Sequence, residues 1–337
     1  MTIRVGINGF GRIGRTVFRI LASRPSIEVV GINDLFEADQ LAYLLQYDTV
    51  MRKYPGEVTA DEGALLADGR RVPLSHERDP EKIPWRDQGV SIVVESTGVF
   101  QKRADLQKHI VAGAERVILT VPPKDEIDAM VVIGVNDDTL RPEHRLVSNA
   151  SCTTNCLAPI AKILDDAFGI EDGLMSTVHA YTNDQRLADV PHKDLRRSRA
   201  AALNTIPTST GAARAVGKVL PKLKGKIDGI AVRVPVPDGS IVELVCRMRS
   251  GPKREDVNRA VREASAGKLA PIVEYSEAPL VSTDIIGNPH SAVFDALSTR
   301  ADGDGYARVL AWYDNEWGYS QRVADLVEIL SRLAPAA

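Results

Sequence analysis

The chain has 337 residues, of which 44% are hydrophobic and 26% are charged, and its formal net charge is −3. This length exceeds what one core usually supports, and the composition is that of an ordinary globular protein, so we expect two domains. The small negative charge argues against nucleic acid as a main partner and offers no attraction for anionic lipid. No apolar run approaches the roughly 18 residues that a membrane span needs, so no membrane partner is expected.

Cysteine usage indicates a reducing compartment. Cys152, Cys156 and Cys246 are too few for a disulfide framework, and no pair has the Cys-x-x-Cys spacing of a metal or redox motif. Cys156 and Cys246 are expected to be buried packing residues. Strand-like residues begin at once at the amino terminus and leave no room for a signal peptide. We therefore expect a cytoplasmic protein without a bound metal.

The first residues carry a dinucleotide-binding pattern. An apolar strand runs into Gly9-Phe10-Gly11-Arg12-Ile13-Gly14, and apolar residues then recur at helical spacing. The glycines permit a tight turn, close approach of a pyrophosphate, and close packing of helix on strand. A second strand ends at Asp34, 20 residues after Gly14, which is the spacing of an acid that binds a ribose hydroxyl. Such an acid repels a 2′-phosphate and favours NAD over NADP; a glycine-rich turn without a ligand is the alternative.

Further buried strands are expected at 91–95 and 116–120. Near-continuous apolar strands indicate a parallel sheet covered on both faces, with ligands at the carboxyl ends of the strands. Thr97 and Thr120 follow two such ends and are candidate cofactor contacts. Arg78 is a candidate for an adenine or phosphate contact, with a solvated surface arginine as the alternative. These elements predict an α/β Rossmann-type NAD-binding domain over residues 1–151.

A cysteine stands where a strand ends and a helix begins, in Ala150-Ser151-Cys152-Thr153-Thr154-Asn155-Cys156. The free N–H groups and the dipole at the start of a helix favour an anion and lower the pKa of a thiol. Pro159 lies inside this helix and predicts a bend. His179 ends a predicted strand 27 residues later, and a Cys–His pair is the usual form of an activated thiol nucleophile. A cysteine that only packs is the alternative.

The second half of the chain changes to longer strands, expected at 174–180, 227–236, 240–248, 291–297 and 306–313. Successive strands with few helices predict an α+β catalytic domain, residues 152–317, with a mainly antiparallel sheet. A carboxyl-terminal helix within 318–337 is expected to pack back on the first domain. Basic and hydroxyl residues gather at 192–211 and suit a phosphate pocket, or form a solvated face. Arg233, centred in an apolar strand, needs an anionic partner.

Five segments together resemble the phosphorylating glyceraldehyde-3-phosphate dehydrogenase family over essentially the whole chain. They are residues 6–15, 150–156, 179–184, 191–197 and 312–319. The resemblance implies that Cys152 attacks an aldehyde, that His179 removes the proton of the resulting hydroxyl, and that a hydride passes to NAD. It implies glyceraldehyde 3-phosphate and inorganic phosphate as substrates and 1,3-bisphosphoglycerate as product. It also implies a homotetramer in which the loop 182–204 lies beside a neighbour's cofactor.

The resemblance also assigns the remaining site residues. The cofactor set, which includes the contacts inferred above, comprises Gly9, Arg12, Ile13, Asp34, Arg78, Thr97, Thr120, Asn183, Asn315 and Tyr319. Within it, Asn315 binds the nicotinamide amide and Tyr319 packs by the nicotinamide. The substrate phosphate is assigned to Thr182, Asp184 and Arg233. The attacking phosphate is assigned to Ser151, Thr153, Arg197, Thr210 and Gly211.

Three alternatives stay open. Erythrose-4-phosphate dehydrogenase shares the cysteine and the histidine, although residues 182–185 and 208–213 resemble the triose enzyme. A cysteine hydrolase or acyltransferase with a vestigial nucleotide fold is the second, and an RNA-binding or scaffolding protein that uses residues 196–199 is the third. The chain departs from the family at 51–53, which read Met-Arg-Lys, and at Val190, which replaces a frequent leucine near the adenosine.

Overall fold

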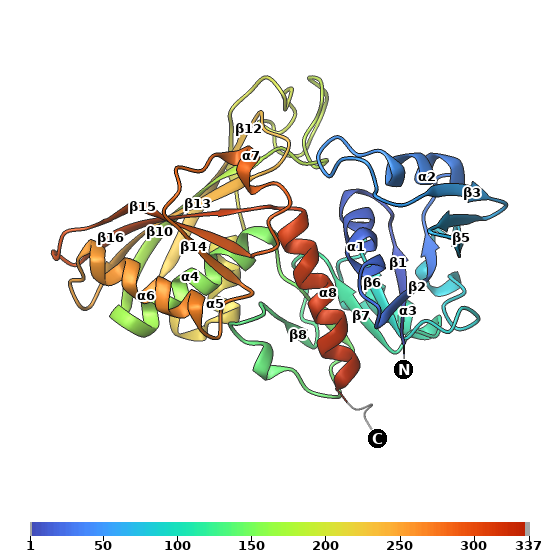
Figure 1. Cartoon of the computed structure of the whole chain (residues 1–337), viewed down its shortest axis with the longest axis horizontal. Helices are drawn as coiled ribbons and strands as arrows, with labels where there is room; N and C mark the ends of the chain where they lie inside the picture. Colours follow the sequence, from blue (N-terminus) through green and yellow to red (C-terminus); the bar gives the residue numbers. More distant parts are fainter. Residues whose placement is uncertain (1, 334–337) are drawn as a thin grey trace. The chain divides into compact units, whose positions relative to one another are not determined.

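The computed structural model describes residues 2–333, which build two β-sheets, one in each of two units (Figure 1). The first unit contains the chain up to Val131, then Asp138–Ala150, and the chain from Ser320 onward. The second contains Val132–Asp137 and Ser151–Tyr319. Among the described residues, no helix combines the length and the apolar character needed to cross a membrane.

The first unit has a nine-stranded sheet that is mostly parallel. Its strands are β1 (Ile3–Asn8), β2 (Ile27–Asn33), β3 (Val58–Asp61), β4 (Ala64–Ala67), β5 (Arg70–Ser75), β6 (Ile92–Glu95), β7 (Arg116–Leu119), β8 (Ala129–Met130) and β9 (Leu146–Ser148). They lie in the order β3-β4-β5-β2-β1-β6-β7-β9-β8. Only β3–β4 and β4–β5 are antiparallel pairs. The inner strands β6 and β7 are buried along their whole length, as the apolar runs predicted.

Helices of the first unit are α1 (Arg12–Ala22), α2 (Ala38–Gln46) and α3 (Arg103–Val111), with the short 3-10 helix η1 (Pro80–Lys82). The helix α1 starts directly after the glycine turn and buries Val17, Phe18, Ile20 and Leu21. From Ser320 onward α8 (Trp317–Arg332) belongs to this unit, and Arg24 forms an ion pair of 2.5 Å with Asp325 on it. Residues 334–337 of the expected helix lie outside the described residues.

The second unit has a seven-stranded sheet in the order β11-β12-β10-β13-β16-β15-β14. Its strands are β10 (Ile170–Ala180), β11 (Ile206–Ser209), β12 (Ile227–Val234), β13 (Ser240–Met248), β14 (Val273–Ser276), β15 (Ala292–Ala301) and β16 (Tyr306–Tyr313). The predicted mainly antiparallel sheet is confirmed, with two parallel pairs, β10–β12 and β14–β15, among antiparallel ones. The chain reaches each of these pairs by a crossover, which parallel neighbours require.

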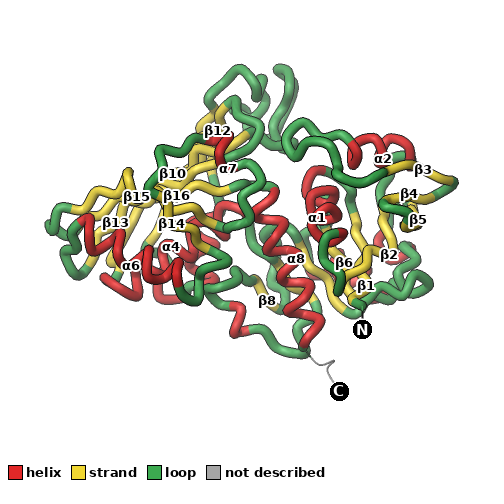
Figure 2. The backbone as a smooth tube through the Cα atoms, in the orientation of Figure 1, coloured by secondary structure: helices red, strands yellow, loops and turns green. Residues whose placement is uncertain are grey.

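Helices lie along one face of this sheet (Figure 1). They are α4 (Cys152–Phe168), α5 (Ala212–Val219) and α6 (Arg254–Ala266). The shorter helices are α7 (Ser282–Ile285) and η3 (Pro221–Leu223) in this unit, and η2 (Asp137–Thr139), which spans the boundary between the two units. The helix α4 contacts β10, β13, β15 and β16 and continues unbroken through the buried Pro159. Figure 2 shows the long loops that connect β10 to β12 in green.

Candidate active site

The sulfur of Cys152 lies 3.5 Å from Nε2 of His179. Cys152 is the first residue of α4, and the hydroxyl of Ser151 caps this helix by accepting the N–H of Thr154 at 3.1 Å. Ala150 has a φ of 54°, a left-handed conformation that costs a non-glycine residue about 1 kcal/mol. The backbone is therefore strained at Ala150, two residues before Cys152.

His179 is buried at the end of β10, and its ring has contacts at both nitrogens. Nδ1 lies 2.7 Å from the carbonyl oxygen of Ala180 and 2.5 Å from Nη1 of Arg233. A guanidinium only donates, so the Arg233 contact requires the ring proton on Nε2, whereas the Ala180 contact requires it on Nδ1. Both tautomers are thus supported, and Nε2 is able either to take a proton or to return it.

The protonation states follow from burial. Burial, assisted by the charge of Arg233, lowers the pKa of His179 to about 3, so the imidazole is neutral at physiological pH. Burial also raises the pKa of the Cys152 thiol above its ordinary value, while Arg233 acts in the opposite direction. The thiol pKa is therefore raised where we expected it to be lowered, because desolvation outweighs the charge of Arg233 and the hydrogen bonds to Thr153.

Arg233 reaches the site through strand register. The strands β10 and β12 pair in parallel with His179 opposite Arg233, which brings both side chains to the same place. Nη1 donates to the Ala180 carbonyl at 2.9 Å, but the buried Nε has no hydrogen-bond partner among the described residues. A partly buried guanidinium whose Nε–H has no partner fits an anionic ligand, since leaving a buried N–H unpaired is costly.

Tyr313 is a site residue that the sequence analysis missed. Its hydroxyl lies 2.9 Å from both Thr153 Oγ1 and Thr177 Oγ1, and its ring meets the His179 ring edge to face at 5.8 Å. Burial raises the pKa of Tyr313 well above its ordinary value, so it remains a neutral phenol. Thr177 and His179 stand two residues apart on one face of β10, and this alternation was the available signal for Thr177.

The basic and hydroxyl-rich stretch forms a compact set of contacts within the second unit. Arg197 pairs with Asp184 and donates to Thr208 Oγ1 at 2.9 Å and to the Ser209 carbonyl at 3.2 Å. The structure thus joins Arg197 and Asp184, which the resemblance assigns to two different phosphates. Thr182 is partly buried, and its N–H donates to Gln185 Oε1 at 3.4 Å.

The start of α5 follows this stretch. The hydroxyl of Thr210 accepts the N–H of Ala212 at 3.2 Å, and Gly211 is the exposed residue before the helix. A side chain at Gly211 would meet no atom within 4 Å. The cofactor candidates of the second unit differ in exposure: Asn183 is exposed, whereas Asn315 and Tyr319 are buried.

In the first unit the three glycines of the turn have different surroundings. Gly9 has a φ of 87°, and a Cβ there would lie 2.7 Å from the backbone N of Thr97. A Cβ on Gly14 would lie 2.1 Å from the carbonyl oxygen of Gly9, whereas one on Gly11 would meet nothing within 4 Å. Gly9 and Gly14 are therefore required for the close packing of this turn, because a side chain at either position would clash. Gly11 leaves open space at the start of α1 that fits a pyrophosphate.

The other predicted cofactor residues of this unit surround the same turn. Asp34 Oδ2 accepts the N–H of Phe10 at 2.6 Å, which ties the acid to the glycine turn. Arg12 forms an ion pair with Asp48, so its guanidinium already has an acidic partner. Ile13 is partly buried and Arg78 is exposed.

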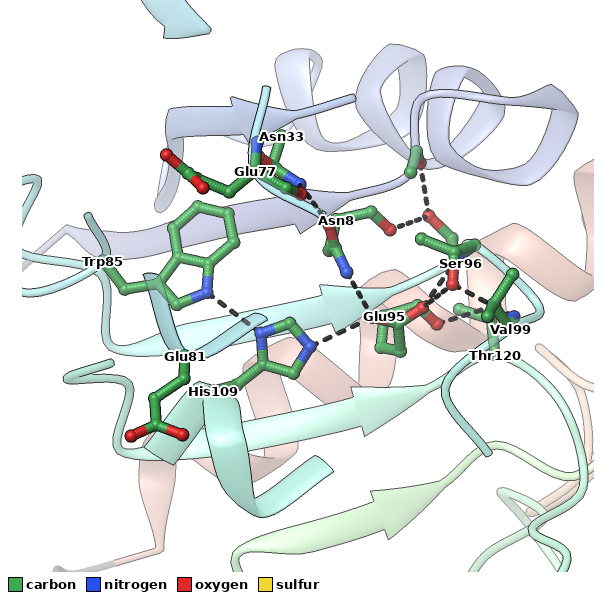
Figure 3. Close-up of polar contacts among 12 residues, drawn as sticks. Asn8, Asn33, Glu77, Glu81, Trp85, Glu95, Ser96, Val99, His109 and Thr120 are labelled. Atoms are coloured by element: carbon green, nitrogen blue, oxygen red, sulfur yellow. Dashed lines mark hydrogen bonds and ion pairs between the residues drawn. The ribbon is translucent and has the colours of Figure 1, made fainter. Parts of the chain in front are cut away.

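A buried carboxylate lies beneath this turn (Figure 3). Glu95 accepts hydrogen bonds from Asn8 Nδ2 at 2.5 Å, from the Thr97 N–H at 2.9 Å, and from the Thr97 hydroxyl. His109 Nδ1 accepts the indole N–H of Trp85 at 3.0 Å, so its Nε2 carries the ring proton and donates to Glu95 at 3.0 Å.

This network engages both threonines expected at the cofactor. The Thr97 hydroxyl donates to the side chain of Glu95. The Thr120 hydroxyl donates to the backbone oxygen of Glu95 at 3.0 Å (Figure 3). Three residues of this network were not predicted from the sequence because they lie far apart in the chain: Asn8, Glu95 and His109. The apolar strand with a single acid at its end was the available signal for Glu95.

Comparison with known proteins adds to this geometry. The family model of the glyceraldehyde 3-phosphate dehydrogenase NAD binding domain matches residues 3–103, and that of the C-terminal domain matches residues 151–315. The chain is 54% identical to glyceraldehyde-3-phosphate dehydrogenase 1 of Bacillus subtilis and 54% identical to glyceraldehyde-3-phosphate dehydrogenase of Priestia megaterium. It is 53% identical to glyceraldehyde-3-phosphate dehydrogenase 2 of Streptomyces arenae. Each alignment covers 98% of this chain and 99% of the relative.

Proposed function

This chain belongs to the glyceraldehyde-3-phosphate dehydrogenase family, and we propose that it oxidises and phosphorylates D-glyceraldehyde 3-phosphate to 1,3-bisphosphoglycerate while it reduces NAD. One observation carries the proposal: a thiol 3.5 Å from a neutral imidazole, next to a partly buried guanidinium whose Nε has no partner among the described residues. A nucleophile, a base and an anion-binding group are what a phosphorylated aldehyde requires.

The reaction proceeds on Cys152. The sulfur bonds to the aldehyde carbon as the carbonyl π bond breaks, and the proton of the thiol passes to the carbonyl oxygen, which becomes a hydroxyl. His179 Nε2 takes the proton from this hydroxyl, and the electron density that stays on the oxygen expels a hydride from the carbon. The sulfur holds the acyl group as a thioester until a phosphate oxygen attacks the carbon, the carbon–sulfur bond breaks and the thiol is restored.

The phosphate groups bind to the cationic and hydroxyl residues of the second unit. Arg233, with Thr182 and Asp184, holds the substrate phosphate, and the free Nε of Arg233 supports this role. The attacking phosphate binds residues at two helix starts, which are Ser151 and Thr153 at α4 and Thr210 and Gly211 at α5. It also binds Arg197, which donates to the carbonyl of Ser209 just before α5. Free N–H groups at such helix starts favour anions.

NAD binds to the first unit through the glycine turn and Asp34, with Arg12, Ile13, Arg78, Thr97 and Thr120 around it. The open space at Gly11 fits a pyrophosphate, and a carboxylate at Asp34 suits a free ribose hydroxyl better than a 2′-phosphate. When bound, NAD supplies the acceptor of the hydride. Asn183, Asn315 and Tyr319 complete the cofactor set, and the NAD-binding and catalytic domains are residues 1–151 and 152–317.

The enzyme is a homotetramer in the cytoplasm. The sheet of the second unit exposes apolar side chains on the face opposite α4, and the most exposed of them is Leu174 at 67%. The loop 182–204 exposes Leu187, Leu195 and Leu203 to more than 80% each. Such contiguous apolar surface suits contact with a second copy. The three cysteines are free thiols, which suits a reducing compartment.

A coupled assay tests the proposal. Purified protein is given glyceraldehyde 3-phosphate or erythrose 4-phosphate, NAD or NADP, with and without inorganic phosphate, and absorbance of the reduced coenzyme is recorded. We expect sustained turnover only with phosphate, a higher kcat/KM for the triose than for the tetrose, and a lower KM for NAD than for NADP. Preference for the tetrose would identify the related dehydrogenase, and the absence of coenzyme reduction would favour the hydrolase alternative.

A further inference from the structure

Two carboxyl groups are buried against each other beside Asn315. Asp238, in the turn between β12 and β13, is 0% exposed, and Asp314, directly after β16, is 1% exposed. Their side chains lie within hydrogen-bonding reach of each other, and Asp238 Oδ2 meets no donor among the described residues. Two buried carboxylates in contact would repel each other, so one of the two acids keeps its proton.

The backbone shows which acid is ionised. Asp314 accepts three N–H groups, from Gly287 at 2.7 Å, Glu316 at 2.8 Å and Trp317 at 2.6 Å, and three such bonds favour the carboxylate. Asp238 accepts only the N–H of Gly239, at 2.8 Å through Oδ1. Its Oδ2 accepts no hydrogen bond from the described residues and is therefore the oxygen that carries the proton toward Asp314.

Burial raises the pKa of both acids, but the hydrogen bonds that Asp314 accepts act in the opposite direction and favour its ionised form. Burial is the main cause that raises the pKa of Asp238, to about 9, and the negative charges of Asp314 and Glu316 add to it. Cys152 on α4 is the further titratable group whose charge interacts with Asp238. The acid pair thus keeps its shared proton at physiological pH.

The shared proton joins two turns that carry site residues. Asp238 is two residues before Ser240, and Asp314 is next to Asn315. The hydroxyl of Ser240 accepts the N–H of Ala180 at 3.0 Å and donates to Asn315 Oδ1 at 2.6 Å. Because the single hydroxyl proton goes to Oδ1, the Nδ2 group of Asn315 is the end left to donate to a ligand.

We propose that Ser240 and the Asp238–Asp314 pair are positioning residues: the pair holds the two turns together, and the Ser240 hydroxyl fixes the Asn315 amide and the strand end beside His179. The expected kinetic effect rests on the proposed function, in which Asn315 binds the amide of the nicotinamide. The proton shared by the pair is a property of the second unit alone and is measured without any substrate.

The first experiment removes the hydroxyl. Ser240→Ala frees the Asn315 amide to rotate, so we expect the KM for NAD to rise about tenfold, the loss of one oriented hydrogen bond, with a smaller change in the KM for glyceraldehyde 3-phosphate. Ser291→Ala is the matched control, because the Ser291 hydroxyl is equally buried and has no hydrogen-bond partner among the described residues. Equal kinetic constants for Ser240→Ala and the control would overturn the role of Ser240.

The second experiment tests the shared proton. Asp238→Asn keeps a donor toward Asp314 and an acceptor for Gly239 but cannot ionise, whereas Asp238→Ala removes both. The folded Asp238 has a raised pKa, so the parent's stability is lost as pH rises from the unfolded value near 4 through about 9. The ratio of the unfolding constants of the parent and Asp238→Asn should therefore change about tenfold per pH unit between pH 5 and 8.

The kinetics of these variants complete the test. Above pH 9 we expect the KM of the parent for NAD to rise, because the pair loses its shared proton. Asp238→Asn should have the parent's KM for NAD at pH 7 and should lack this rise. Asp238→Ala should have a raised KM for NAD already at pH 7. A pH-independent ratio of unfolding constants would overturn the shared proton, whether or not Asp238→Ala folds. Failure of all coenzyme reduction in the parent would instead refute the proposed function and leave the unfolding result valid.

Discussion

Gly11→Ala separates the space for the cofactor from the stability of the fold. Gly11 precedes α1 with a φ of −72° and a ψ of −157°, which alanine also adopts, and its added methyl meets no atom within 4 Å. The free energy of unfolding should change by less than about 0.5 kcal/mol, because the weaker helix cap and the reduced entropy of the unfolded chain offset each other. The methyl occupies the space assigned to the pyrophosphate, so we expect the Kd for NAD to rise at least about tenfold, or about 1.4 kcal/mol.

Gly14→Ala adds the same methyl at a position where the fold has no room. The new Cβ would lie 2.1 Å from the carbonyl oxygen of Gly9, a backbone atom that cannot rotate away. Overpacking of this kind costs about 1–3 kcal/mol. At about 2–4 °C per kcal/mol, Gly14→Ala should lower the Tm by several degrees.

Calorimetric Tm values and NAD titrations of the two variants and the parent check this contrast. We expect Gly11→Ala to bind NAD more weakly while its Tm equals that of the parent, and we expect Gly14→Ala to have a lower Tm. If Gly11→Ala binds NAD as tightly as the parent, the pyrophosphate does not lie at this turn. If both variants lose the same Tm, the reasoning from the surroundings of each glycine is wrong.

Three further predictions concern single side chains. Because burial lowers the pKa of His179 to about 3, alkylation of Cys152 by iodoacetamide should show no inflection near pH 6.5; an inflection there that is absent from His179→Asn would contradict a neutral imidazole. Replacing alanine by glycine usually lowers the free energy of unfolding by about 1 kcal/mol, but Ala150→Gly should not, because glycine adopts the φ of 54° without strain. A full loss of about 1 kcal/mol in urea unfolding would contradict strain at this residue. Glu95→Gln should lower the free energy of unfolding by about 1–3 kcal/mol and weaken NAD binding, because the new amide NH₂ would face the donors Asn8 Nδ2 or the Thr97 N–H. An unchanged urea unfolding curve would refute the role of the hydrogen bonds around Glu95.

Local patterns were sufficient for much of the fold. The strands β13 and β16 have the predicted bounds, because alternating side chains and turn residues mark both ends. The helix α6 was not predicted, since it is rich in charge and buries only Val257 and Val261. The strands β11 and β14 were not predicted either, because they have four residues each and lack the continuous apolar run that marks the equally short β6 and β7.

The site was predictable where residue type alone specifies chemistry, as for Cys152 and His179. Contacts that depend on strand register were not, because register is set by the whole sheet. Ser240 lies opposite Tyr313 only through the pairing of β13 with β16, and no local pattern reports that pairing. The direction of the thiol pKa was also not predicted, because the desolvation that raises it depends on the packing around Cys152 and not on a local sequence pattern.

The central claim is that Cys152 carries the acyl group, and a single-turnover experiment without phosphate tests it most directly. Enzyme is mixed with glyceraldehyde 3-phosphate and NAD, quenched in acid, digested and weighed by mass spectrometry while NADH is recorded. We predict a burst of one NADH per chain and a phosphoglyceroyl group on the peptide that contains Cys152, both lost in Cys152→Ser. A full burst with the acyl group on another residue, or with no acylated peptide, would contradict the account.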